Sequence, residues 1–338
     1  MSTYLTIAGL VAGLLVLCAA MLVLSTWTTA RKVEAVLPPK GRFVDVPGAR
    51  LHVREFGELD EMPGETGAAR PVIVMIHGLA GQLSHYTYGV AAKLAGRHRV
   101  VVVDRPGSGH STRDASTPAD LSTQAASIAA LIRSLGTGPA HVVGHSLGGA
   151  IALALALEHP QQVASLALLA PLTHLRDDVP PVFKGLTIAS PLVRKLVAWT
   201  LAIPASIKGS AATLEQVFGP EAVPKDFATR GGGLLSLRPS AFLSASADLQ
   251  ALPGSLPQIQ ARYPTLRLPL RVLYGKDDRI LDWKANGQAL VDKVAGARLE
   301  LVEGGHMLPV TQVEATVAFI EAALADAAQS GAKGLAAG

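Results

Sequence analysis

A serine, a carboxylate and a histidine occur in this chain in an order and in local surroundings that suit acyl-transfer chemistry. Ser146 is the centre of the pentapeptide Gly-His-Ser-Leu-Gly at 144–148. A β-branched run precedes it and a stretch rich in alanine and leucine follows it, which is typical of a strand, a sharp turn and a helix. Such a turn holds the serine hydroxyl clear of the chain. The pentapeptide alone is weak evidence, because the same letters also form idle structural turns.

Two further segments can supply the partners that a serine nucleophile needs. Asp277 and Asp278 lie in a turn after the strand-like run 270–274, and His306 lies in a glycine loop after the run 298–302. A carboxylate in that place can orient the histidine and stabilise its charged form, while the histidine takes the serine proton. The order serine, aspartate, histidine is the order expected of this kind of strand-and-helix hydrolase.

A third segment can stabilise the negative charge that develops on a substrate oxygen. The loop 77–81 follows the apolar run 72–76 and begins with His-Gly. We expect the backbone N–H of Leu79 to form an oxyanion hole together with the N–H of Leu147. His77 is expected to brace this loop by hydrogen bonding.

These motifs, together with Asp-Arg-Pro-Gly-Ser-Gly-His-Ser at 104–111, resemble the α/β-hydrolase-fold serine hydrolases of esterase and lipase type over 41–324. Each motif is moderately specific, but all five occur in order. The resemblance implies a mainly parallel α/β-hydrolase sheet with helices on both faces and a helical cap insertion. It also implies Ser146 as nucleophile, His306 as base and Asp278 as the acid.

The resemblance also narrows the chemistry. The family spacing of glycine, two residues and aspartate favours Asp278 over Asp277, and the adjacent pair leaves the reverse assignment open. Haloalkane dehalogenases and epoxide hydrolases of this fold carry an aspartate where this chain has Ser146. An alkoxide nucleophile needs a polarised acyl carbon, which favours ester, thioester, amide or activated C–C acyl cleavage. A perhydrolase would use the same three residues.

The length of the chain predicts an insertion in the hydrolase core. Roughly a hundred residues separate the strand-like runs 163–169 and 268–274, far more than an ordinary connection of about 4–6 residues. We expect the core at 41–171 and 259–325 and a cap at 172–258. Six large apolar residues of the cap either form its own core or line an acyl pocket: Phe183, Leu186, Trp199, Phe218, Phe227 and Phe242.

The N-terminus predicts a membrane anchor. Residues 4–27 contain no charged residue, and about 20 apolar residues suffice to cross a bilayer as a helix. A cleaved signal peptide is the weaker alternative, because no lysine or arginine precedes the run and Ala19-Ala20 is a poor cleavage site. Residues 28–40, which end in Pro38-Pro39-Lys40, are expected to form a short stiff linker.

The flanking charges predict an orientation. Arg31, Lys32, Lys40 and Arg42 follow the span and none precedes it. The positive-inside rule then places the catalytic domain of a single-pass protein on the cytoplasmic side of a bacterial inner membrane. Export of the domain is the alternative, because four charges are a modest bias.

Other classes of function find no support in the sequence. The net charge is +4, and no basic run is interleaved with aromatic residues, so we expect no nucleic-acid partner. No histidine pair has metal-ligand spacing with a carboxylate, so we expect neither metal nor cofactor. Cys18 is the only cysteine, which excludes an intrachain disulfide. Residues 57–70 are expected to form a surface loop, and 326–338 a flexible tail.

Four other residues receive structural interpretations. His145 is expected to pack away from the site, and His85 and His110 to border the pocket or lie at the surface. Asp104 is expected to cap the turn at 106–107.

The sequence therefore predicts a membrane-anchored serine hydrolase that cleaves small apolar or amphipathic carboxylic esters through an acyl-enzyme. The first alternative is a C–C acyl hydrolase or perhydrolase with the same three residues. A non-catalytic, membrane-bound binding module is the alternative from another class. The sequence makes no prediction of oligomeric state.

Overall fold

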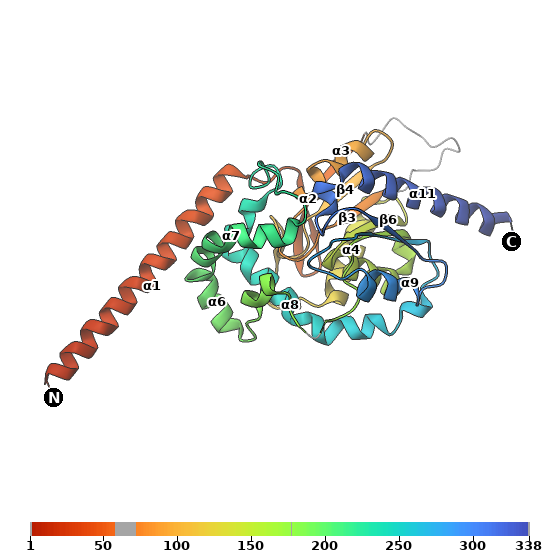
Figure 1. Ribbon diagram of the computed structural model, residues 1–338. Helices are drawn as coiled ribbons and strands as arrows, with labels where there is room; N and C mark the ends of the chain where they lie inside the picture. The colour runs from red at the N-terminus through yellow and green to blue at the C-terminus, as the bar shows by residue number, and fades with distance from the viewer. Residues whose placement is uncertain (1, 58–71, 177, 337–338) are drawn as a thin grey trace.

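The structure is a computed structural model that describes residues 2–57, 72–176 and 178–336 (Figure 1). The surface loop predicted at 57–70 lies outside these ranges, apart from Gly57.

A mixed, mainly parallel sheet forms the centre of the described chain. Its strand order is β1-β2-β4-β3-β6-β7-β8-β9, and β5 pairs with β2. The strands are β1 (Arg42–Val46), β2 (Ala49–Phe56), β3 (Ile73–Ile76), β4 (Val100–Val103), β5 (Thr112–Arg113), β6 (Ala140–His145), β7 (Val163–Leu169), β8 (Leu270–Gly275) and β9 (Arg298–Val302). The strands from β3 and β4 to β9 are parallel, whereas β1, β2 and β5 pair antiparallel. The predicted sheet is confirmed.

Helices on the two faces explain why the parallel strands are continuous apolar runs. α11 (Val313–Ala336) packs on β7 and β8 and against α3 (Val90–Leu94), while α5 (Leu147–Glu158) packs on β6 and β7 and against α4 (Leu121–Leu135). Figure 1 shows α3 and α11 on one side of the sheet and α4 on the other. Strands covered on both faces bury every side chain, so β3 and β4 are fully buried.

The connection from β7 to β8 carries the predicted helical cap. Its elements are η2 (Pro181–Leu186), α6 (Pro191–Trp199), α7 (Ala202–Phe218), η3 (Gly233–Leu237), α8 (Pro239–Gln260) and η4 (Tyr263–Thr265). α8 packs back against α4 and α5, and its residues Leu252, Leu256 and Ile259 belong to the main core. The boundary expected at 258–259 therefore lies within one helix. The remaining helices are α2 (Ser84–Thr87), η1 (Pro160–Gln162), η5 (Lys284–Gln288), α9 (Ala289–Val291) and α10 (Leu308–Thr311).

The N-terminal helix α1 (Ser2–Val36) is long and apolar enough to cross a membrane, with a mean hydropathy of 2.8 over its most apolar window. It continues nine residues beyond 27, so the linker predicted at 28–40 is wrong for 28–36. The helix continues because residues 28–37 contain no glycine or proline. At Pro38-Pro39 a proline disfavours helix for the preceding residue.

Both ends of the chain are more helical than expected. α11 runs to Ala336, so the flexible tail predicted at 326–338 is helical through most of its length. Its composition is rich in alanine, which has the highest helix propensity, and this explains the difference.

Candidate active site

Ser146 occupies a strained turn between β6 and α5. Its backbone has φ 54° and ψ −120°, a region that residues with a Cβ rarely adopt. A Cβ at Gly148 would lie 2.2 Å from the carbonyl oxygen of Ile76, and one at Gly144 would lie 2.5 Å from the carbonyl oxygen of Gly148. The two glycines therefore allow the turn to be this tight, and the turn presents Ser146 at the start of a helix.

The base and the acid predicted from the sequence are in contact. The Nδ1 of His306 lies 2.7 Å from the Oδ2 of Asp278, and the carboxylate is fully buried. The other carboxylate oxygen, Oδ1, accepts hydrogen bonds from the backbone N–H groups of Ile280 and Leu281 at 2.8 and 2.9 Å. These bonds fix the carboxylate so that Oδ2 faces the imidazole. Asp277 is exposed, so the structure pairs His306 with Asp278.

The loop of His306 meets the serine turn. His145, which precedes Ser146, donates from Nε2 to the carbonyl oxygen of His306 at 2.9 Å, and the two rings lie 4.9 Å apart. The Ser146 hydroxyl makes no hydrogen bond to any residue that the structure describes. Ser146 and His306 are thus not hydrogen-bonded in this structure, and catalytic hydrogen bonds are often long in hydrolases without a bound substrate.

The two backbone amides predicted to bind the oxyanion, those of Leu79 and Leu147, both belong to segments beside Ser146. A Cβ on Gly78 would lie 2.9 Å from the Cβ of Ser146, which places the loop of Leu79 directly against the serine. Leu147 is the first residue of α5, and the first N–H groups of a helix have no partner within it. Within the described ranges, the backbone N–H groups of Leu79 and Leu147 have no hydrogen-bond acceptor. Both donors are therefore free to bind an oxyanion.

A buried arginine holds the oxyanion loop. Arg105 donates from Nε to the carbonyl oxygen of His77 and from Nη2 to that of Gly78, both at 3.0 Å. Its Nη1 donates to Gln124 at 2.7 Å and to Asp248 of α8 at 2.8 Å. The ion pair between Arg105 and Asp248 is completely buried. It links the cap helix α8 to the loop that carries Leu79.

Comparisons with known proteins agree with this geometry. Residues 71–207 match the family described as the alpha/beta hydrolase fold. The magnesium-chelatase 30 kDa subunit of Rhodobacter capsulatus is 30% identical over 272 residues, which cover 75% of this chain and 87% of that protein. The chain belongs to the α/β-hydrolase fold family. Membership of this α/β-hydrolase family supports a hydrolase activity.

Two further similarities differ in extent. The dihydrolipoyllysine-residue acetyltransferase component of the acetoin cleaving system from Pseudomonas putida is 39% identical over 110 residues. The match spans 32% of this chain and only 28% of that relative's length. A solved structure of a membrane phospholipase A is 25% identical, has a TM-score of 0.66, and is aligned over 97% of this chain and 99% of that one.

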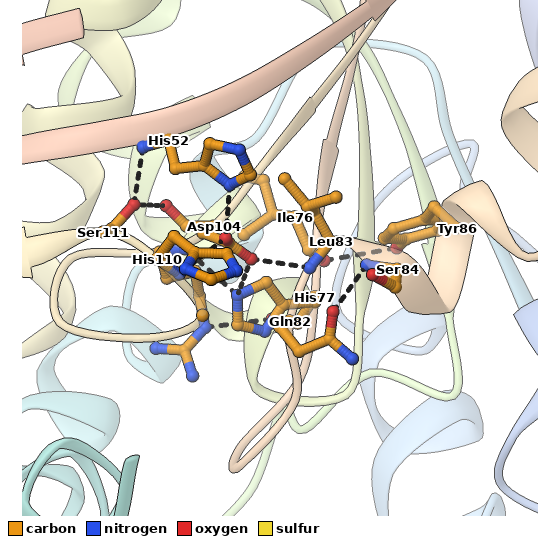
Figure 2. A network of polar contacts seen from close by, with 12 residues as sticks. His52, Ile76, His77, Gln82, Leu83, Ser84, Tyr86, Asp104, His110 and Ser111 are labelled. Carbon is orange, nitrogen blue, oxygen red and sulfur yellow. Dashed lines mark hydrogen bonds and ion pairs between the residues drawn. The ribbon is translucent and has the colours of Figure 1, made fainter. Parts of the chain in front are cut away.

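Asp104 has a larger role in this α/β-hydrolase than the sequence predicted. Its Oδ2 accepts from the Nδ1 of His52 at 2.8 Å and from the backbone N–H of His110 at 2.9 Å, and its Oδ1 accepts from the N–H of Leu83 at 2.7 Å (Figure 2). The Nε2 of His52 in turn lies 2.9 Å from the carbonyl oxygen of Lys40. Asp104 therefore joins the oxyanion loop to the segment that follows α1, and the prediction of a simple turn cap is wrong.

Two histidines, His85 and His145, are buried near the α/β-hydrolase site. His145 was expected to pack away from the site, but it contacts the backbone and the ring of His306. His85 is buried, and its ring lies 5.8 Å from that of Phe227. Burial lowers the pKa of His85 to about 4 and lowers the pKa of His145 well below its ordinary value. Both are therefore neutral at pH 7.

A carboxylate from the cap accepts hydrogen bonds from the loop of His306. Glu221 accepts from the backbone N–H of Gly305 at 2.8 Å and from the Nε2 of Gln312 at 3.1 Å. No local motif marks Glu221, because it lies 84 residues before Gly305. This cap residue positions the histidine loop.

Aromatic residues of the cap pack against the segment that follows His306. Phe218 and Phe227 form a buried cluster with Met307 and Val310, and the two phenylalanine rings lie 4.7 Å apart. For these two residues the structure favours packing over an open acyl pocket. The cluster still lies at the site, because Phe227 contacts His85.

A cavity of about 210 Å³ lies where α1 ends, between the oxyanion loop and the cap. Its lining includes Leu37, Lys40, Gln82, His110 and Arg230. His110 is half-buried and lines this cavity. The described ranges hold no group of three or more His, Cys, Asp or Glu residues that could bind a metal ion.

Proposed function

We propose that this α/β-hydrolase is a membrane-anchored serine hydrolase that cleaves carboxylic esters of apolar or amphipathic substrates. The observation that carries the proposal is the contact of 2.7 Å between His306 and Asp278 beside a serine in a strained turn. A structural turn has no need of a buried histidine–carboxylate pair whose other oxygen is held by two backbone amides. A nucleophile does need it, because the pair accepts and returns the serine proton.

The reaction we propose begins with attack of the Ser146 oxygen on the ester carbonyl carbon. The serine proton passes to the Nε2 of His306, and Asp278 stabilises the imidazolium from Nδ1. The N–H groups of Leu79 and Leu147 hold the oxyanion. The alcohol leaves with the proton from His306, and an acyl-enzyme remains. A water molecule then gives a proton to His306 while its oxygen attacks the acyl carbon. The acid leaves as His306 returns that proton to the Ser146 oxygen, which restores Ser146.

The substrate class rests on the surroundings of the site. The cap brings Phe218 and Phe227 to the residues that follow His306, and an apolar helix is attached to the same domain. A solved structure with 25% identity is a membrane phospholipase A, which supports a membrane-associated ester as substrate. We expect a small apolar or amphipathic ester and no cofactor.

The test is ester hydrolysis by the full-length protein in detergent, measured on p-nitrophenyl esters of increasing acyl length. We expect turnover that rises from acetyl to medium-length acyl groups. Ser146→Ala should lose activity by a factor on the order of 10⁴, because loss of the nucleophile removes the acyl-enzyme path. Asp277→Asn serves as the matched control, since Asp277 is exposed and unpaired with His306. A Ser146→Ala protein that keeps half of its activity would sink the proposal.

A second candidate is a non-catalytic membrane-bound binding module. The 30%-identical relative is named as a subunit of a magnesium chelatase, and this name favours a role within an assembly. Absence of turnover on the whole ester panel, together with an unreactive Ser146, would favour this candidate.

A further inference from the structure

One surface of the cap exposes large apolar side chains. We define the cap apolar face by five residues of α6, of the turn that follows it and of the first half of α7. Their exposed fractions are 81% at Leu192, 48% at Val193, 64% at Leu196, 57% at Leu201 and 49% at Ile207. Scattered exposed apolar residues are normal on soluble proteins, but these five lie on two neighbouring helices that pack together. Exposed apolar side chains gathered in one place mark a surface that meets a partner or a membrane.

The cap apolar face adjoins the helix that could cross the membrane. α1 packs against α6, α7 and η3. Thr26, Ala30 and Val33, spaced four and three residues apart, are buried, while the rest of α1 is largely exposed. Figure 1 shows α6 and α7 on the side of the globular part that faces α1. The contact therefore starts at the level of residue 26, just where the uncharged stretch 4–27 ends.

The charge of the same segment favours an anionic surface. Residues 179–214 contain no aspartate or glutamate. The segment carries four cations: Lys184, Arg194, Lys195 and Lys208. The three lysines are exposed and form no ion pair within the part of the chain that the structure describes. Apolar side chains flanked by lysines are what binds a helix to the interface of a membrane with anionic lipids.

We propose that the cap apolar face inserts into the interface of the bilayer that α1 crosses, and that the flanking lysines contact anionic lipid headgroups. The inference rests on the membrane anchoring in the proposed function and deepens it. Phe218 at the end of α7 belongs to the cluster that packs against Met307, next to His306. An inserted cap thus holds the site beside the lipid from which an amphipathic ester would come.

The direct test places an environment-sensitive probe on the face. In the full-length protein, Cys18→Ser removes the native cysteine and Leu196→Cys provides the site for the fluorophore NBD. The labelled protein is reconstituted in vesicles of phosphatidylcholine and phosphatidylglycerol. We expect a blue-shifted emission that lipids with a shallow nitroxide quench. Gln329→Cys, an exposed site on α11, is the control and should report water. The same water-like emission at both sites would overturn the inference.

This readout needs no catalysis, so it separates the two proposals. Repeated with Ser146→Ala, the probe result should be unchanged even if no ester is ever hydrolysed. A second copy of the chain is the other occupant that could cover the face. Two results in detergent would identify that occupant and overturn membrane insertion. The shielding of the probe would increase with protein concentration, and light scattering would give a dimeric mass.

A paired variant tests the consequence for substrate delivery. Leu192→Asp with Leu196→Asp changes two exposed residues, so the fold and the turnover of a short soluble ester should be kept. Turnover of a long-chain ester held in the vesicles should fall by about tenfold, because two carboxylates repel anionic lipid and resist burial in acyl chains. Gln161→Asp, exposed elsewhere, is the matched control. A double variant that turns over the long-chain ester as fast as the unaltered protein does would contradict the inference.

Discussion

At the scale of single residues, Asp278 combines two tasks that explain why it and not its neighbour faces the histidine. One carboxylate oxygen accepts two backbone N–H groups and the other lies at 2.7 Å from His306. The first contact fixes the direction of the second, so His306 is held in one orientation and one tautomer. Asp277 has neither contact and is exposed.

We therefore expect Asp278→Asn to reduce kcat/KM far more than Asp277→Asn. Loss of the charge that stabilises the imidazolium costs on the order of 10⁴ in related chemistry, whereas the exposed neighbour should change the rate by no more than about twofold. Kinetics on one p-nitrophenyl ester with both variants decide the matter. Equal small losses would move the acid to another residue.

The buried histidines make the folded state sensitive to acid. Burial lowers the pKa of His85 to about 4, while in the unfolded chain the imidazole has its ordinary pKa of about 6.5. Between these values the unfolded state binds more protons than the folded state, so stability falls as the pH falls. The contribution is fully present above pH 6.5 and is lost by about pH 4.

We expect the urea midpoint of unfolding to fall between pH 7.5 and pH 5, and His85→Gln to reduce this dependence relative to the unaltered chain. Circular dichroism at a series of pH values measures both. A midpoint that stays constant over this range would show that His85 is not held neutral by burial.

At the scale of elements, the cap and the core are joined through buried polar contacts and not only by apolar packing. Asp248 of α8 accepts from Arg105 and from Arg113, both at 2.8 Å. Arg105 in turn holds the carbonyl groups of His77 and Gly78. Asp248 and Arg105 therefore link α8 to the oxyanion loop through buried polar contacts.

Asp248→Asn should destabilise the protein by about 3–5 kcal/mol, because it leaves two arginines without their buried counter-charge. Urea unfolding measured at constant pH gives this free energy. Arg271→Gln, which breaks partly exposed ion pairs with Glu300 and Asp326, is the control and should cost about 1 kcal/mol or less. A similar small cost at Asp248 would mean that the buried network is not what joins α8 to the core.

Glu221 makes a second, partly buried polar contact between the cap and the core, and its loss should affect catalysis. We expect Glu221→Ala to lower kcat by about 10- to 100-fold with a smaller change in KM, because a loop that is free to shift by about 1 Å misplaces His306. Glu221→Gln keeps an oxygen that can accept from Gly305 and should recover much of the rate. Failure of the glutamine variant to exceed the alanine variant would argue against positioning through this hydrogen bond.

The elements also show what could be predicted from the sequence. Buried parallel strands are apolar runs, so β3, β7, β8 and β9 were found at close to their observed bounds. The serine turn was found because glycines at 144 and 148 are required by close backbone approach. The contacts of Asp104, Glu221 and Asp248 were missed, since each joins segments far apart along the chain and no local pattern specifies such pairs.

At the scale of the whole molecule, the globular domain is attached to the C-terminal end of a long apolar helix. α1 spans 35 residues, whereas about 20 suffice to cross a bilayer. The excess turns pack on the cap through Thr26, Ala30 and Val33. The segment after the helix is tied to the core by His52, whose Nε2 faces the carbonyl of Lys40. The domain is thus held close to the C-terminal end of α1.

We therefore expect the full-length protein to stay in the membrane pellet after high salt and carbonate and to be released by detergent. Its uncharged span satisfies its backbone groups within one helix, as a bilayer requires. Release by carbonate alone, or a mature N-terminus near Ala20, would contradict a retained anchor. Protease protection in spheroplasts tests the orientation, for which the four cations after the span predict a cytoplasmic domain.

The central claim is that Ser146 is an activated nucleophile, and covalent labelling tests it most directly. The full-length protein in detergent is treated with a fluorophosphonate, digested, and mapped by mass spectrometry, with Ser146→Ala and Asp278→Asn treated in parallel. We predict a single modified site at Ser146, no label in Ser146→Ala, and a labelling rate in Asp278→Asn lower by at least about 100-fold. An unmodified Ser146 in a protein that is folded by circular dichroism, or a label on another residue that survives Ser146→Ala, would contradict the account.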